Sequence, residues 1–157
     1  MTRWPECGES LLSELRRVPG RLALIVDDRD SSVARAFSQL QAVTVHHAGA
    51  SLSAGPPKTP AEVIDRLAAA GPVVADLDLL FWKPWLALDP LGVLRAVCRR
   101  RPAILFQWPG TVSGTHATYS TPGRRDWYEA TLSDAVVLRP SVALFPDESP
   151  YCIERYP

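Results

Sequence analysis

The chain has 157 residues, of which 46% are hydrophobic and 22% are charged, and its formal net charge is zero. This length favours one domain with its own core, and the composition is typical of an ordinary soluble globular protein. The zero net charge excludes a global electrostatic attraction to nucleic acids or membrane surfaces, because that attraction requires an excess of basic residues.

The first half of the chain alternates helical patterns with apolar runs. Apolar side chains at helical spacing predict three helices, over residues 10–18, 31–41 and 59–71. Near-continuous apolar runs predict three strands, over residues 21–28, 42–49 and 72–81. The intervening residues 50–60 are rich in Ser, Gly and Pro and are predicted to form a loop.

The second half continues the alternation as far as residue 140. It predicts a helix over residues 90–101, a strand over 102–110, a short helix around 126–132 and a fifth strand over 134–140. The tail, residues 141–157, has weak periodicity and is expected to pack over a sheet edge or to fray. Residues 1–20 supply the first helix and its lead-in, so the whole chain, residues 1–157, is predicted to be a single domain.

Apolar strands that alternate with helices predict the fold class. We expect an α/β protein of three layers, with a parallel sheet of about five strands and helices on both faces. Right-handed crossovers place the carboxyl ends of all parallel strands at one edge, where ligands usually bind. The polar side chains expected at that edge are Asp27, Asp28, Asp76, Asp78, Gln107 and Arg139.

The acidic residues at this edge allow one interpretation as a Mg²⁺ pocket. The pair Asp27-Asp28 and either Asp76 or Asp78 supply the carboxylates that a hard octahedral cation prefers. The arrangement resembles a response-regulator receiver domain, which would imply a Mg²⁺-binding switch. The chain differs from that pattern at two places: Gln107 stands where strand four should supply Ser or Thr, and Arg139 replaces the phosphoryl-holding lysine.

A second interpretation is a P-loop NTPase-like core. Asp76 or Asp78 would be the Walker B acid at the end of strand three. The Walker A motif needs glycines and a lysine, but Asp27 stands at the first glycine and residues 32–34 replace Gly-Lys-Ser/Thr. Aspartate at that position repels a polyanion, so ATP binding would be residual or lost. The degenerate phosphate loop would comprise Asp27, Asp28, Ser31 and Ser32.

A resemblance over most of the chain favours the P-loop interpretation. Residues 75–130 look like BrxF, the small P-loop protein of type 3 BREX phage-defence systems, and the helix at 10–18 is also in the expected place. The matching residues are Leu80, Phe81, Asp89, Pro90, Leu91, Leu94, Arg99, Arg101, Trp108, Pro109, Gly110, Thr118, Tyr119, Pro122, Gly123 and Tyr128.

The resemblance implies a role in antiviral defence beside larger subunits. These would be a large ATPase, a DNA methyltransferase and an alkaline-phosphatase-like protein; DNA would be reached through them, and a second copy of the chain is a further candidate partner. Loss of the Walker A residues favours an adaptor or regulator that is not an enzyme and needs no cofactor. A Mg²⁺-binding switch and a residual ATP-binding NTPase are the alternatives. Strand order separates them: a receiver has strand one between strands two and three, whereas this P-loop class has strand four between one and three.

Three tryptophans are candidate partner contacts. Trp82 and Trp85 flank Lys83 and Pro84 in a predicted loop, and Trp108 follows strand four. Exposed tryptophans often anchor interfaces, so exposure of these rings would favour an adaptor.

The remaining polar motifs are weaker signals. His46 and His47 have no Cys or acidic partners at ligand spacing, so we expect surface or structural histidines. Three cysteines, odd in number and far apart, indicate neither a disulfide framework nor a zinc site. Arg124 and Arg125 follow a Pro-Gly turn and would extend a basic patch. No signal-peptide layout and no apolar run of 18 residues is present, so we expect a cytoplasmic protein without membrane contact.

Overall fold

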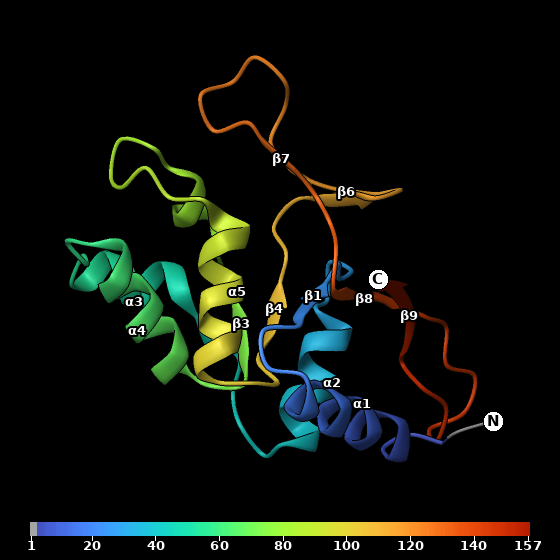
Figure 1. Cartoon of the computed structure of the whole chain (residues 1–157). Coiled ribbons are helices and arrows are strands. Elements are labelled where there is room, and N and C mark those ends of the chain that lie inside the picture. The colour runs from blue at the N-terminus through green and yellow to red at the C-terminus, as the bar shows by residue number, and fades with distance from the viewer. Residues whose placement is uncertain (1–2) are drawn as a thin grey trace.

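A computed structural model, which describes residues 3–157, has a six-stranded sheet at its centre (Figure 1). The strand order is β2-β3-β4-β1-β8-β9. The first five strands in this order run parallel, and β9 runs antiparallel to β8 at the edge. The strands are β1 (Leu22–Ile25), β2 (His46–His47), β3 (Val73–Ala75), β4 (Leu105–Gln107), β8 (Ala135–Pro140) and β9 (Tyr151–Tyr156).

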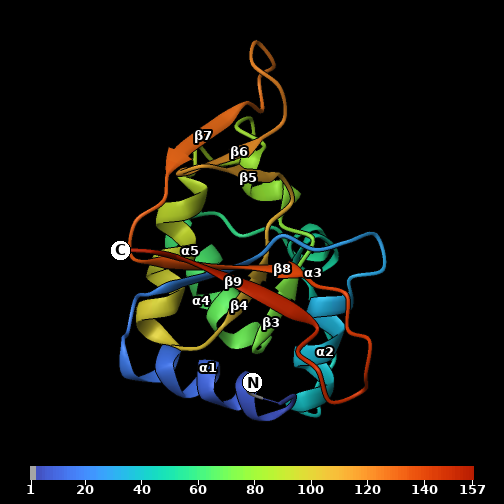
Figure 2. The same cartoon turned by 90° about the vertical axis from the view of Figure 1, so that its right-hand side faces the viewer.

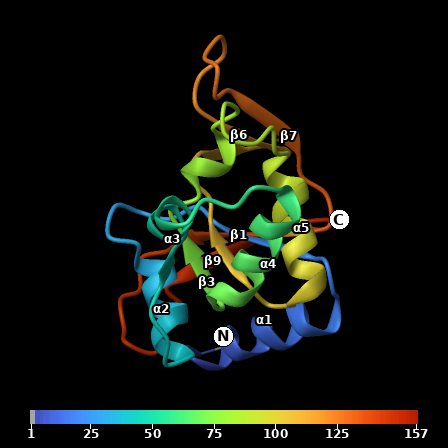
Figure 3. The same ribbon diagram turned by 90° about the vertical axis from the view of Figure 1, so that its left-hand side faces the viewer.

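Helices cover both faces of this sheet, as the sequence predicts. In β1, Ala23 and Ile25 pack with the helices of one face, and Leu22 and Leu24 pack with those of the other. Figure 2 shows the molecule from the side of the two helices on the first of these faces, and Figure 3 shows it from the side of the three helices on the second face. The first face carries α1 (Glu6–Arg17) and α2 (Ser32–Leu40), and the second carries α3 (Ala48–Ala54), α4 (Pro60–Ala70) and α5 (Pro90–Arg100).

A second, antiparallel sheet lies beyond the end of β4 (Figure 1). Its strands are β5 (Thr111–Ser113), β6 (His116–Tyr119) and β7 (Tyr128–Thr131). The prediction of a short helix around residues 126–132 is therefore wrong. In β7, half-buried Tyr128 and Ala130 alternate with exposed Glu129 and Thr131, which is the period of a strand.

Other elements differ from their predicted form. Residues 48–54 form helix α3, which replaces the end of the predicted strand over 42–49 and the start of the predicted loop over 50–60. The rest of that strand is reduced to the two residues of β2. The predicted strand over 72–81 ends at Ala75, and residues Asp78–Phe81 form the 3-10 helix η1. The tail packs over a sheet edge as expected, and it does so by pairing β9 with β8.

The position of β4 distinguishes the two expected topologies. Parallel pairing joins β4 to β1 on one side and to β3 on the other, so the fourth strand lies between the first and the third. This order differs from the receiver order, in which the first strand lies between the second and the third. No helix in residues 3–157 is long and apolar enough to cross a membrane.

Candidate functional site

A cavity of about 460 Å³ opens at the carboxyl ends of β1, β3 and β4. It brings together residues that the sequence places at this edge, and it also includes His47, which was expected to be a surface or structural residue. Arg139 does not line it, because its guanidinium instead donates to Glu154 Oε1 and to the carbonyl of Val112, at 2.6 Å each. The residues that the sequence predicted at this edge and that do line the cavity are Asp27, Asp28, Ser31, Asp76, Asp78 and Gln107.

The Asp27 carboxylate lies against the amino end of α2. Its Oδ1 accepts the backbone N–H of Val33 at 3.1 Å, and its Oδ2 accepts that of Ala34 at 2.9 Å. Oδ1 also accepts the N–H of Asp28 at 3.0 Å. Backbone amides and the positive end of a helix dipole favour an anion at such a point. In this chain the anion is supplied by its own Asp27 side chain.

The next residue, Asp28, accepts hydrogen bonds from the first residue of the same helix. Its Oδ2 accepts the Ser32 hydroxyl at 2.5 Å, and its Oδ1 accepts the Ser32 backbone N–H at 3.0 Å. These two bonds, the hydroxyl first and the amide second, hold the pKa of the Asp28 carboxyl below its ordinary value. The Asp28 carboxylate is therefore ionised at neutral pH, and both of its oxygens accept hydrogen bonds from Ser32.

Gln107 connects the end of β4 to the turn between β1 and α2. Its side-chain amide donates to Ser31 Oγ at 3.0 Å and to Asp27 Oδ2 at 3.4 Å. Ser31 adopts a left-handed conformation, with φ of 53°, and its N–H donates to the carbonyl of Asp28 at 3.1 Å. These contacts hold the turn in a closed form, with its polar groups satisfied from within the chain.

Asp76 directly follows β3 and adopts a left-handed conformation, with φ of 60°. Its carboxylate lies beside Gly49 at the start of α3, where a Cβ would stand 2.4 Å from Asp76 Oδ2. Gly49 therefore provides the room for this carboxylate, because any side chain there would collide with it. The sequence contained the signal, a glycine two residues after β2, but no local pattern connects it to the residue that follows β3.

Asp78 has a different partner on the second sheet. The hydroxyl of Tyr119 donates to Asp78 Oδ1 at 2.9 Å, and the Tyr119 ring stacks on Phe81 with centroids 3.9 Å apart. The two candidate Walker B acids are thus separated in role: Asp76 faces α3, whereas Asp78 ties η1 to β6.

The three tryptophans also differ. Trp108 is 3% exposed, and its Nε1 donates to the carbonyl of Thr118 at 3.0 Å, so it serves the core and corrects the prediction of a partner contact. Trp85 is half-buried against the core, whereas Trp82 is 55% exposed.

Within residues 3–157, no three His, Cys, Asp or Glu side chains are grouped so that they could hold a metal ion. Asp27 and Asp28 direct carboxylate oxygens to amides of α2, which leaves fewer oxygens for a cation.

The sequence matches no protein-family model, and neither a curated protein nor a solved structure matches it. The fold and the cavity define the class: an α/β protein with a mostly parallel sheet and an acidic cavity at its carboxyl edge.

The tyrosines around and beyond the site give a testable pH dependence. Burial is the largest cause that raises the pKa of all four, and it raises that of Tyr119 to about 12 with the help of the Asp78 hydrogen bond. The pKa of each tyrosine is therefore higher in the folded state than in the unfolded state, where it is about 10. Below that pH the tyrosines do not reduce the free energy of unfolding, but as the pH rises from about 10 towards the folded pKa values the protein loses stability. We expect the melting temperature to fall above that pH.

The ultraviolet absorbance of tyrosinate checks this expectation. At a pH of about 10, the unfolded chain in urea should show about half of its tyrosines ionised, and the native chain clearly fewer. Equal ionisation in the two states would contradict it. Tyr119→Phe, which keeps the stacked ring, should reduce the alkaline loss of stability.

Proposed function

We propose that this chain is a non-catalytic, P-loop-like adaptor of a BREX-type defence system, which binds larger defence subunits without using ATP. The defence role rests on the resemblance to the BrxF-like family. The P-loop-like core is supported by the strand order, with β4 between β1 and β3, and by the turn that joins β1 to α2 at the carboxyl edge of the sheet.

The observation that carries the loss of ATP binding is the place of the Asp27 carboxylate. It accepts N–H groups of Val33 and Ala34 at the amino end of α2, where a phosphate would sit in a working P-loop. Val33 also stands where the phosphate-binding lysine would be. A nucleotide would have to displace an internal anion and approach further carboxylates, without a lysine to offset the repulsion.

Exposed apolar side chains supply candidate contacts for a protein partner. Trp82 is 55% exposed, and in the loop between β8 and β9 the exposed fractions of Val142, Leu144 and Phe145 are 86%, 77% and 63%. Large apolar side chains so exposed often become buried in an interface. The partners proposed are the large ATPase, the methyltransferase and the alkaline-phosphatase-like protein of such a system.

Isothermal calorimetry with ATP·Mg²⁺, and then with Mg²⁺ alone, tests the nucleotide part. We expect no heat of binding in either titration. Micromolar binding of ATP would contradict a closed phosphate loop. Heat with Mg²⁺ alone that disappears in Asp28→Asn would instead identify a divalent-cation site in the acidic cavity.

Co-purification with each proposed partner tests the adaptor part. We expect one of them to retain the wild-type chain, and Leu144→Ser with Phe145→Ser to lose that retention. Val43→Ser is the matched control, because Val43 is also an exposed apolar residue, at 38%, but lies after α2. Failure of all three partners to retain the chain would contradict the proposed role.

A further inference from the structure

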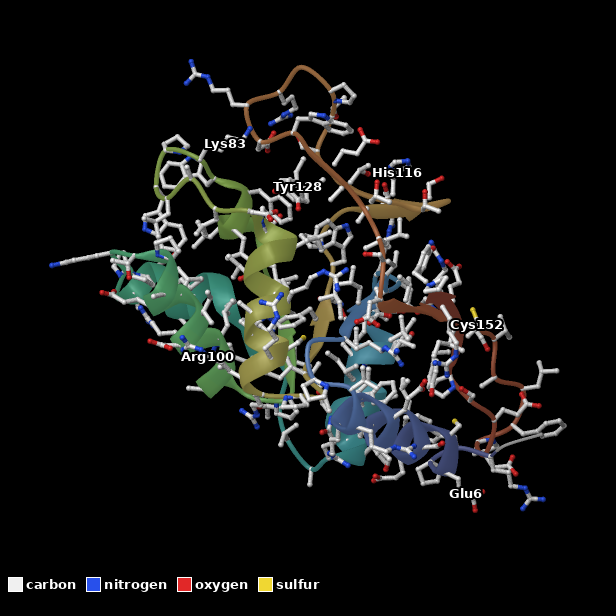
Figure 4. The ribbon with its side chains drawn as sticks, viewed as in Figure 1. Glu6, Lys83, Arg100, His116, Tyr128 and Cys152 are labelled. Atoms are coloured by element: carbon white, nitrogen blue, oxygen red, sulfur yellow. The ribbon has the colours of Figure 1, made fainter. Side chains whose placement is uncertain are left out.

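Two loops lie side by side at the end of the molecule that carries the second sheet (Figure 1). One connects η1 to α5, and the other connects β6 to β7. Figure 4 shows Lys83, from the first loop, at the same end as Tyr128, where the second loop finishes. The loops border a cavity of about 380 Å³, separate from the acidic cavity described above.

The polar lining of this second cavity is mostly cationic. Lys83, Arg124 and Arg125 contribute three positive charges, and Asp126 contributes one negative charge. Asp126 accepts the Ser120 hydroxyl at 2.6 Å and pairs with Arg124 at 3.4 Å. Within residues 3–157, no carboxylate lies within ion-pair distance of Lys83 or Arg125. The cavity therefore has a local excess of positive charge in a chain whose net charge is zero.

An aromatic surface lies next to these cations. Trp82 lines the cavity and is 55% exposed, whereas Phe81 beside it is 4% exposed and packs into the aromatic cluster with Trp108 and Tyr119. The buried ring anchors the start of the loop, so the exposed ring is held near the cations. A partly exposed indole ring beside positive charges suits a ligand that has both a flat ring and an anionic backbone.

We propose that this cavity binds single-stranded nucleic acid, with a base stacked on Trp82 and phosphates held by Lys83, Arg124 and Arg125. Single strands present the unpaired bases that an exposed aromatic ring can stack. A duplex would offer phosphates to the cations but would keep its bases inside. An acidic peptide would likewise use the cations and leave the indole face without a partner. This inference does not depend on the proposed adaptor role.

Fluorescence anisotropy of the full chain alone tests the proposal. The probe is a fluorescein-labelled oligothymidine of about 12 nucleotides, within the site sizes that small single-strand-binding folds cover. Between about 50 and 200 mM salt, three phosphate contacts predict a slope of log K against log salt near −2. A duplex of the same length should bind at least several-fold more weakly.

Variants separate stacking from charge. Trp82→Ala should weaken binding by about 5- to 150-fold, which is the range for losing one stacked base. Arg124→Glu with Arg125→Glu should abolish it, and Lys83→Glu should weaken it independently. The matched control is Arg16→Glu with Arg17→Glu, which makes the same charge change on exposed residues of α1, at the opposite end of the molecule (Figure 1).

Four results would overturn the proposal. The first is no binding of the oligonucleotide at the lower salt concentration. The second is an equal loss in the α1 control, which would indicate attraction by overall charge. The third is unchanged binding by Trp82→Ala together with equal binding of duplex, which would exclude base stacking. The fourth is competition by polyglutamate as strong as by unlabelled oligothymidine, which would indicate an acidic protein partner.

Discussion

Replacement of Asp27 by alanine is expected to lower the melting temperature by about 6–12 °C, which corresponds to about 3 kcal/mol for a domain of this size. The carboxylate accepts three backbone N–H groups, from Asp28, Val33 and Ala34, and a longer contact from Gln107. Removing it leaves these donors without their acceptor at the amino end of α2. Hydrogen bonds to a charged group are also stronger than neutral ones, which is why the expected loss is large.

The same variant should acquire a response to inorganic phosphate. Without the internal carboxylate, the amides of Val33 and Ala34 form an empty anion site at the start of a helix. We expect phosphate to raise the melting temperature of Asp27→Ala relative to chloride at equal ionic strength, because a ligand that binds only the folded state stabilises it. The wild-type protein should show no such difference.

Asp30→Ala is the matched control for both measurements. Asp30 is an exposed carboxylate in the same turn, and within residues 3–157 its side chain accepts no hydrogen bond that a truncation would remove. Its melting temperature should change little, and phosphate should not affect it. An equal loss in the two variants would mean that the charge of the turn matters and the contacts of Asp27 do not.

The central strands could be predicted because both faces of each are covered. All four residues of β1 are buried, and so are the residues of β3, so their sequences contain continuous apolar runs. Such runs between helical patterns predict an α/β fold without knowledge of the pairing. The order of the strands could not be predicted in this way, because it depends on contacts between residues far apart in the chain.

The second sheet could not be predicted in the same way. The four residues of β7 contain a Tyr, a Glu and an Ala, which are compatible with a short helix as well as a strand. Pairing decides the outcome: Ala130 lies opposite Ala117 of β6, and that ladder depends on a loop that returns the chain. The strand β9 could not be predicted for the same reason, because its register is set by pairing with β8.

The acidic edge was predictable in position but not in detail. Parallel strands bring Asp27 and Asp76 to one cavity, as topology requires. The sequence could not show that Asp27 accepts N–H groups of α2, or that Gln107, 76 residues from Ser31, reaches its hydroxyl. The burial of Trp108 could likewise not be predicted, because it depends on the second sheet, which the sequence does not reveal.

The second large effect is expected for Gly110→Ala, which should cost about 3 kcal/mol and lower the melting temperature by about 6–12 °C. A Cβ at this position would stand 1.8 Å from the carbonyl oxygen of Thr118 and 2.8 Å from its carbon. Both atoms belong to the backbone of β6, so no side-chain rotation can relieve the collision. The same oxygen accepts the indole Nε1–H of Trp108 at 3.0 Å, so moving β6 away also breaks that hydrogen bond.

Hydrogen exchange shows where the loss falls. In Gly110→Ala, amides of β5, β6 and β7 should exchange faster, whereas those of β1 and β4 should stay protected, because the collision involves only the second sheet. Gly55→Ala is the control, since a Cβ there would meet only Arg66 atoms at 3.9 and 4.0 Å, and the change should be within about 0.5 kcal/mol. An unchanged melting temperature and exchange pattern in Gly110→Ala would mean that the second sheet moves freely over the main sheet. The wall that Trp108 and Pro109 give to the acidic cavity would then be movable, and the closed geometry around Asp27 would be only one of its states.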